Sequence, residues 1–189
     1  VFPQNTIKNG WYQIQLDTSV LCSGGFLTVR DAVIAVADTD VNFMNYDRVM
    51  IVFPNPVGCS SSTLGTQPVT TNDGQAMLST SILTQVNDID NGVGAHEFAH
   101  QLGLFHANDW ECETQTIGGS CSSILVGDQF DILGAFGKRG HLNAYHKETT
   151  GWIELNNITN PTGTYTIEPL ETSGSGIKGL KIPIANGLN

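Results

Sequence analysis

The sequence predicts an α+β fold, and four stretches carry that prediction. Residues 26–43 and 92–103 place apolar side chains at helical spacing, whereas 11–17 and 47–54 are short runs typical of strands. The chain has 189 residues, of which 40% are hydrophobic and 14% are charged, and this is enough for one sizeable core. We therefore expect a twisted, mixed sheet backed by two helices.

Each of these elements has its own signal. In 11–17 (WYQIQLD), apolar and polar residues alternate, which is typical of a strand. In 26–43, Leu27 and Ile34 lie at helical spacing, and the run is longer than a typical strand, so we expect a helix despite its β-branched residues. Residues 47–54 form a short apolar run that ends in proline, which predicts a buried strand followed by a loop.

The later segments are less regular. Residues 55–74 are rich in Ser, Thr, Gly and Pro and predict a loop, and 75–82 (QAMLSTSI) is polar enough to predict an edge strand. Residues 141–153 predict a second helix that ends at Gly151. From 156 to 189 the chain changes to short strand-like runs, which indicate the start of a β-rich C-terminal segment or a truncated chain.

Charge and hydropathy exclude two classes of partner. The formal net charge is −10 and the isoelectric point is near 4.6, so nucleic acid and anionic membrane surfaces would be repelled. No stretch reaches the roughly 20 apolar residues that span a bilayer. We expect a monomer with a solvated acidic surface and no membrane span.

The four cysteines predict an oxidising compartment, and hence a secreted protein. None of them forms a C-x-x-C pair, which disfavours a cysteine-type zinc site. Four cysteines allow three connectivities, and spacing alone does not choose among them. Cys112 and Cys121 flank a short Gly-rich loop that a disulfide could close, and Cys22 would then pair with Cys59.

A turn at 87–92 (NDIDNG) is rich in carboxylate and amide oxygens, which are the ligands that calcium prefers. The turn lacks the spacing and the final Glu of an EF-hand loop. We therefore expect a solvated turn, with a calcium site as the alternative.

Three of the five histidines lie within residues 96–106 (HEFAHQLGLFH). On a helix, residues four apart share a face, so His96 and His100 present their imidazoles to a common point. Neutral imidazole is a preferred zinc ligand. Glu97 is offset by about 100° of helix rotation, which places it beside the metal. That is the geometry of a general base acting on a metal-bound water.

A helix that continued past Gly103 would carry His106 too far along its axis to reach the same ion. Glycine accepts positive φ and ends helices, so we expect Gly103 to stop the helix and to let His106 turn back as the third ligand. Three protein ligands leave a fourth position for water, as a catalytic zinc site requires. The alternative is an ordinary helix with three histidines, and the full spacing H-E-x-x-H-x-x-G-x-x-H disfavours it.

This motif resembles the extended zinc motif of the metzincin metallopeptidases at every defined position. The stretch 142–153 (LNAYHKETTGWI) is similar to an element of the gametolysin-like peptidases, and a similar element occurs in the immune inhibitor A-like secreted peptidases. The similarity covers roughly residues 45–155, and it is sharpest at 96–109 and 128–152.

The resemblance implies a zinc-dependent endopeptidase that hydrolyses extracellular proteins. His96, His100 and His106 would bind Zn²⁺. Glu97 would take a proton from the attacking water and pass it to the leaving amine.

The resemblance also implies a domain plan. A catalytic domain would span 1–155, with an upper subdomain over about 1–103, a lower one over about 104–155, and the zinc cleft between them. The segment 156–189 would be the β-rich continuation. The substrate would be a protein or peptide in an extended conformation that adds to an edge strand, which we place at 75–80.

Two positions depart from the family's pattern. Metzincins carry a tight turn beneath the zinc with Met at its centre, and aligning FDILG with D-x-M-G puts Leu133 there. Leu has a similar volume, and such swaps usually cost less than about 1.5 kcal/mol. Many members place a Tyr after this turn to help stabilise the oxyanion, but here the residue is Phe136. Tyr145, His141 or His146 could substitute for it, or could be ordinary residues of the second helix.

Asp109 completes the pattern H-x-x-G-x-x-H-x-x-D found in some metzincins. The resemblance implies that it anchors the structure near the site or holds a ligand from its outer side. An ordinary loop or cap residue is the alternative.

Two other functions are compatible with the motif. A recognition or adhesion module of metzincin fold that binds zinc without catalysis would accommodate Leu133 and Phe136, but it has no need of Glu97. A structural zinc site would require a fourth protein ligand, and no Cys or fourth His lies at a suitable spacing nearby.

Overall fold

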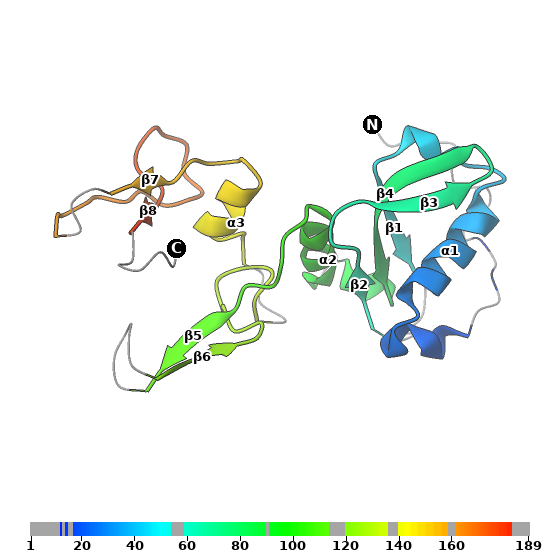
Figure 1. Ribbon diagram of the computed structural model, residues 1–189, viewed down its shortest axis with the longest axis horizontal. Coiled ribbons are helices and arrows are strands. Elements are labelled where there is room, and N and C mark those ends of the chain that lie inside the picture. Colours follow the sequence, from blue (N-terminus) through cyan, green and yellow to red (C-terminus); the bar gives the residue numbers. More distant parts are fainter. Residues whose placement is uncertain are drawn as a thin grey trace. The chain divides into compact units, whose positions relative to one another are not determined.

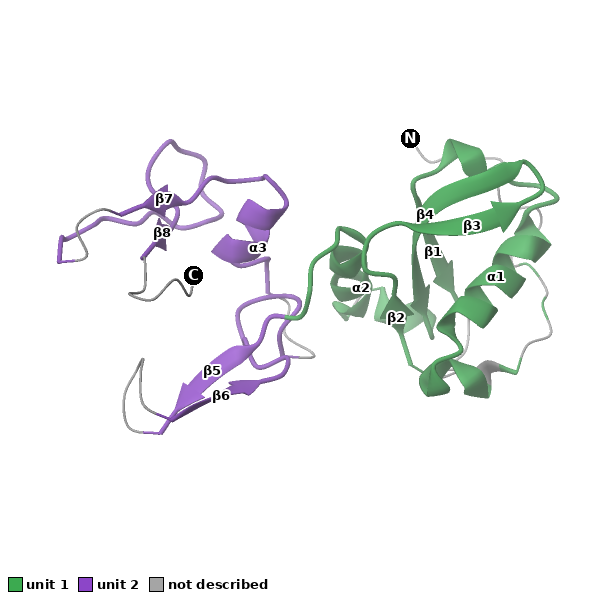
Figure 2. Cartoon of the chain, viewed as in Figure 1, with its two compact units in different colours: residues 1–106 green, residues 107–189 purple. Residues whose placement is uncertain are grey.

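The computed structural model describes residues 12, 14, 17–53, 59–89, 91–113, 120–135, 140–158 and 162–182. The chain divides into two compact units, residues 1–106 and 107–189 (Figure 2). Most of the strand predicted at 11–17 lies outside the described residues.

The first unit holds a sheet, two α-helices and three 3₁₀ helices among its described residues (Figure 1). Its elements in chain order are η1 (Thr18–Ser23), α1 (Phe26–Ala37), η2 (Phe43–Asn45), β1 (Arg48–Val52), β2 (Ser61–Ser62), β3 (Gln67–Thr71), β4 (Gly74–Leu83), η3 (Val86–Asp88) and α2 (Val93–Gln101). Strand β1 runs parallel to β4, whereas β2 and β3 run antiparallel to it. This mixed α/β structure, with a mixed sheet and few helices, agrees with the predicted α+β class.

The prediction that residues 75–82 form an edge strand is wrong for residues 79–82. The whole stretch belongs to β4, but β1 pairs only with Ser79–Leu83 and β2 only with Ser81 and Ile82, whereas residues 75–78 pair with β3 alone among the described strands. The polar residues that suggested an edge are buried, with Ser79 and Ser81 fully inaccessible. Their hydroxyls hydrogen-bond to carbonyl oxygens of α2, and this satisfies their polarity without solvent.

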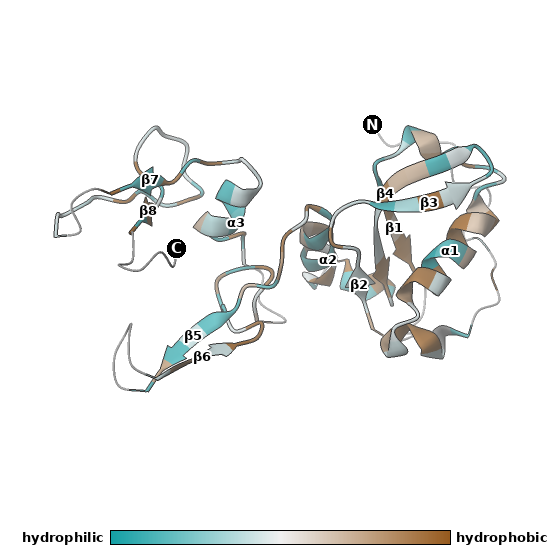
Figure 3. Cartoon of the chain, in the orientation of Figure 1, coloured by the Kyte–Doolittle hydropathy of each residue, from teal (hydrophilic) through white to brown (hydrophobic). Residues whose placement is uncertain are grey.

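The apolar core of this unit lies between α1 and the sheet. One cluster joins Ile34 of α1 to Val69 of β3 and Leu78 of β4, and a second joins Val29 of α1 to Ile82 of β4. Leu78 and Ile82 alternate along β4 with the serines that face α2, because successive strand residues point to opposite faces. Figure 3 shows β1 as a hydrophobic strand, whereas β5 of the second unit is hydrophilic.

Helix α1 ends at Ala37 rather than at the predicted residue 43. The residues that follow are Asp, Thr and Asn types, which compete with helical hydrogen bonding. Asp38 Oδ2 accepts a hydrogen bond from the backbone N–H of Asn72 at 2.6 Å, and Asn42 caps η2 through its bond from the N–H of Met44. The helix therefore stops where side chains offer the backbone other partners.

The second unit contains β5 (Asp109–Cys112), β6 (Cys121–Ile124), α3 (Ala144–Thr149), β7 (Asn156–Asn157) and β8 (Leu180–Lys181) among its described residues. Strands β5 and β6 form an antiparallel pair, and β7 and β8 pair in parallel over two residues each. The residues described from 162 to 179 form no strand, so β7 and β8 are the strands of the predicted β-rich tail that the described residues contain.

The helix predicted at 141–153 shortens to α3. Asn143 is its N-cap, and the Asn143 side chain accepts a hydrogen bond from the N–H of His146 at 2.9 Å. His141 and Leu142 precede the cap because the backbone of His141 pairs with Asp131 in an isolated bridge. The predicted end at Gly151 agrees with that residue's φ of 75°, which favours glycine.

Two disulfides close the chain on itself. Cys22 pairs with Cys59 and Cys112 with Cys121, and this confirms the pairing favoured from the Gly-rich loop. Disulfides persist in oxidising compartments, and they are compatible with a secreted protein. Among the helices of the described residues, none is long and apolar enough to span a membrane.

Candidate metal centre

Helix α2 carries two of the three histidines and is held to the sheet by polar contacts. Ser81 Oγ donates to the carbonyl oxygen of Glu97 at 3.1 Å, and Ser79 Oγ donates to that of Gln101 at 3.2 Å. Gln101 Nε2 donates in turn to Ser81 Oγ and to the carbonyl oxygen of Val49. These bonds set the rotation of the helix on the sheet, and so they also set the direction of its histidine face.

The helix ends as the sequence predicted. Leu102 is the C-cap, and Gly103 follows with a φ of 87°, in the left-handed region. The N–H of Gly103 donates to the carbonyl of His100 at 2.9 Å, and the N–H of Leu104 donates to that of Ala99 at 3.4 Å. This pair of bonds is the Schellman motif, which reverses the chain at a helix C-terminus. The reversal returns His106 to the histidine face of α2.

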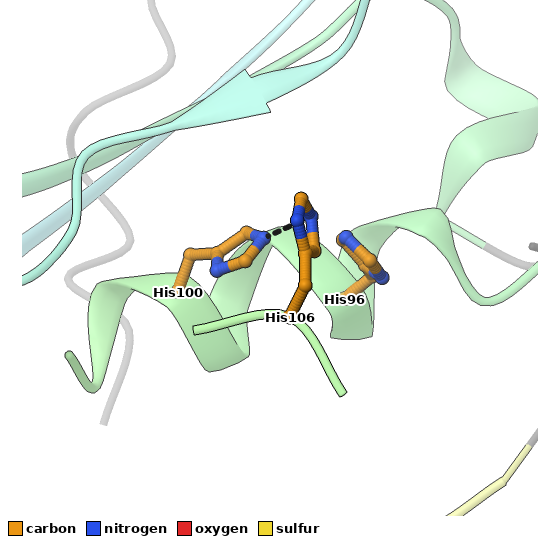
Figure 4. A group of neighbouring side chains, drawn as sticks. All are labelled: His96, His100 and His106. Atoms are coloured by element: carbon orange, nitrogen blue, oxygen red, sulfur yellow. Dashed lines mark hydrogen bonds between the residues drawn. The ribbon is translucent and has the colours of Figure 1, made fainter. Parts of the chain in front are cut away.

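The three imidazoles converge on one side of α2 (Figure 4). One ligand nitrogen from each of His96, His100 and His106 lies within 4.8 Å of the others. His100 Nε2 lies 3.2 Å from His106 Nε2. Among the described residues, these histidines form the one group of three or more His, Cys, Asp or Glu side chains that could hold a metal ion.

A backbone contact orients one of the rings. His100 Nδ1 lies 2.7 Å from the carbonyl oxygen of Leu104, which can only accept a hydrogen bond. The proton therefore belongs on Nδ1, and the lone pair of Nε2 is left for a metal ion. Metal-binding histidines commonly donate their second ring N–H in this way.

The spacing of two of the nitrogens fits a tetrahedral ion. Metal–nitrogen bonds of about 2.0–2.1 Å at the tetrahedral angle place two ligand nitrogens about 3.3 Å apart. The 3.2 Å between His100 Nε2 and His106 Nε2 matches this value. His96 is buried, whereas the other two histidines keep access to solvent, so an ion held here could also bind a water molecule or a substrate atom.

The acid between the histidines is buried as well. The Glu97 side chain is 6% exposed, and burial, with a smaller contribution from the charge of Asp88, raises its pKa to about 7. Burial also lowers the pKa of His106, with the neighbouring His100 adding to the effect. Both shifts follow from the cost of charge in a poorly solvated place.

The carbonyls at the end of α2 have partners on the sheet and its loops. The carbonyl of His100 accepts a second hydrogen bond from the N–H of Gly65 at 3.0 Å. That of Gln101 accepts one from Arg48 Nη1 at 2.8 Å. The last turn, which would otherwise fray, is thus tied to the segments around β1 and β2.

No protein-family model, curated protein or solved structure matched the chain.

The remaining predicted residues have contacts of their own. Asp109 is exposed at the start of β5, and its Oδ1 accepts a hydrogen bond from the N–H of Trp110, so its predicted support of the site stays a prediction. Leu133 is fully buried in a turn, and its predicted role as the floor of the site stays a prediction. Tyr145 is exposed on α3, and Phe136 lies outside the described residues.

The turn at 87–92 is not the solvated turn that the sequence favoured. Asp88 is buried rather than solvated, and its carboxylate accepts hydrogen bonds from Ser60, Thr84 and Gln85. Although burial raises the pKa of Asp88, these bonds outweigh it and hold the pKa below its ordinary value. The carboxylate closes a polar cluster before α2, and Asp90 lies outside the described residues, so the calcium alternative stays a prediction.

Sequence reasoning missed the polar contacts that fasten α2. The alternation of Ser79 and Ser81 with apolar residues could have indicated that they are buried. A strand with one apolar face and one face of small polar residues can be covered on both sides. No sequence pattern could indicate that Leu104 accepts a hydrogen bond from His100, because the acceptor is its backbone carbonyl, which every residue has.

Proposed function

We propose that this chain is a secreted, zinc-dependent endopeptidase of the metzincin type. The observation that carries the proposal is the convergence of three histidine nitrogens, with His100 Nε2 and His106 Nε2 at a separation of 3.2 Å. Histidine ligands suit Zn²⁺, and a set of three leaves a position for chemistry. The two disulfides support a secreted protein.

A zinc ion held by these residues would supply a Lewis acid that polarises the scissile carbonyl and acidifies a water molecule. Glu97 follows His96 on the same helix, and its carboxylate would take the proton of the attacking water. It would then deliver that proton to the leaving amine. The network of Ser79, Ser81 and Gln101 keeps the helix in place during this transfer.

The substrate would be an extended peptide that adds a strand to the sheet. Because Ser79 and Thr80 of β4 pair with β1 and are buried, residues 75–80 do not offer a continuous free edge for this addition. We place it instead at β2, an outer strand of the described sheet. The N–H of Gly65, three residues after β2, donates to the carbonyl of the ligand His100, so this segment runs beside the metal helix.

The proposal is tested by cleavage of casein or gelatin with zinc-loaded protein, with chelator-treated protein and with the variant Glu97→Gln. Zinc-loaded protein should cleave, and the chelator should abolish cleavage. Glu97→Gln should keep its zinc, measured by atomic absorption, and lose at least about a hundredfold in rate, because a positioned acid–base group contributes that much. Glu111→Gln, an exposed carboxylate on β5, is the matched control and should keep full activity.

Three outcomes would contradict the proposal in whole or in part. Zinc bound stoichiometrically without any cleavage would favour the recognition module. Global unfolding on zinc removal, again without cleavage, would favour a structural ion. Full activity in Glu97→Gln would remove this residue from the mechanism.

A further inference from the structure

Asp131 is fully buried in the second unit, and three donors surround its carboxylate. Oδ1 accepts from the N–H of Leu133 at 2.7 Å. Oδ2 accepts from the N–H of Asn143 at 2.6 Å and lies 2.8 Å from Nδ1 of the buried His146. One carboxylate thus joins the turn around Leu133 to the start of α3.

That turn is tightly closed. The N–H of Ala135 donates to the carbonyl of Asp128 at 2.8 Å, and Asn143 Nδ2 donates to Asp128 Oδ2 at 3.2 Å. A Cβ at Gly134 would lie 1.7 Å from the carbonyl oxygen of Asp128, so only glycine fits there. The turn is therefore closed by its own hydrogen bonds, and Asp131 and Asn143 attach it to α3.

The same turn holds the residue that follows the third histidine. The N–H of Ala107 donates to the carbonyl of Leu133 at 3.0 Å, and the carbonyl of Ala107 accepts from the N–H of Asp128 at 3.2 Å. Both backbone groups of Ala107 are therefore fixed, one residue after His106.

We propose that the buried Asp131–His146 pair is a positioning device that sets the third metal ligand, His106, through Leu133 and Ala107. This inference rests on the metal site of the proposed function. His96 and His100 are held by a helix, but His106 lies beyond it, so its backbone needs another anchor. Residues that hold a metal ligand in place without binding the metal themselves typically matter for affinity. Their removal lowers metal affinity by about 10- to 100-fold.

The test compares three variants. His146→Leu removes the donor to Asp131, whereas His146→Asn keeps an amide N–H near the position of Nδ1. His141→Leu is the matched control, because His141 is an exposed histidine of the same segment whose side chain pairs with Glu171 instead. Two quantities are measured: hydrogen exchange of the Ala107 amide in metal-free protein, and Co²⁺ affinity by competition with a chelating dye.

His146→Leu should speed exchange at Ala107 and weaken Co²⁺ binding at least about tenfold, with an altered Co²⁺ absorption spectrum. His146→Asn should recover most of the protection of the Ala107 amide and most of the Co²⁺ affinity. His141→Leu should match the wild type in both measurements. The inference would be overturned if His146→Leu showed the same Ala107 amide exchange and the same Co²⁺ affinity as the wild type. If that variant does not fold, Asp131→Asn decides the question by the same measurements. Failure of the endopeptidase proposal is separate, because it appears as absent cleavage by wild-type protein that still binds the metal.

Discussion

His100 Nδ1 lies 2.7 Å from the carbonyl oxygen of Leu104, the residue that follows the glycine ending the metal helix. The reversal at Gly103 therefore does two things. It brings the Leu104 carbonyl to one nitrogen of the His100 ring, and it brings His106 to the other. The orientation of the second ligand and the return of the chain toward the third therefore share one backbone conformation.

Replacing Gly103 by Ala should weaken metal binding about tenfold and destabilise the protein by about 1–2 kcal/mol, the cost of left-handed backbone in an L-residue. A Cβ at this position would meet nothing within 4 Å, so the cost is conformational and not steric. Isothermal titration with Zn²⁺ and urea unfolding measure the two effects.

Gly24→Ala is the control for this experiment. Gly24 has a φ of 92° and equally open surroundings, but it caps η1. It should show a similar loss of stability with unchanged metal affinity. Equal affinities in both variants and the wild type would show that the Gly103 turn does not position the ligands.

Leu133→Met should change the free energy of unfolding by less than about 1.5 kcal/mol and leave metal affinity intact, because the volume is conserved. Leu133→Ala should cost about 2–5 kcal/mol, because Leu133 is fully buried and a cavity would remain. Chemical denaturation of the two variants side by side is the measurement. A large loss in Leu133→Met would mean that the turn is shaped for leucine.

Acid should destabilise the protein through Asp131. Burial raises the pKa of this carboxyl, but hydrogen bonds from His146 and from the backbone of Asn143 and Leu133 outweigh it, so the pKa lies below 3.8. Ionised Asp131 therefore stabilises the fold fully above about pH 4, and this contribution is lost as the pH falls through the lowered pKa.

Urea unfolding between pH 2.5 and about 7 tests this point. Asp131→Asn should be less stable at neutral pH and should lose less stability on acidification than the wild type. Asp73→Asn, at an exposed turn residue, serves as the control and should follow the wild-type curve. If the free energy of unfolding fell equally with pH in Asp131→Asn and in the wild type, ionised Asp131 would not be the source of the acid sensitivity.

The two disulfides should contribute unequally. Cys22–Cys59 spans 37 residues and Cys112–Cys121 spans 9. In the chain-entropy model, their removal costs about 4 and about 2.5 kcal/mol, respectively. Paired Cys→Ser variants compared by thermal unfolding measure the two costs. A larger loss for Cys112–Cys121 would show that native contacts, and not loop entropy, dominate.

The sequence by itself determined the local parts of this protein. The histidine helix, its end at Gly103 and the return of His106 follow from residue spacing and glycine's backbone freedom, which act over about ten residues. The helix at 26–43 and the strand at 47–54 were found for the same reason, with ends misjudged where Asp38 and Asn42 made side-chain bonds.

Only the tertiary structure decided which polar residues are buried and what satisfies them. Ser79 and Ser81 indicated an edge strand until α2 supplied their acceptors, and Asp131 and His146 had no visible connection until the chain brought them within 2.8 Å. Such pairs are 15 or more residues apart in sequence. A buried polar group is stabilised only by a specific partner in space, and periodicity carries no information about that partner.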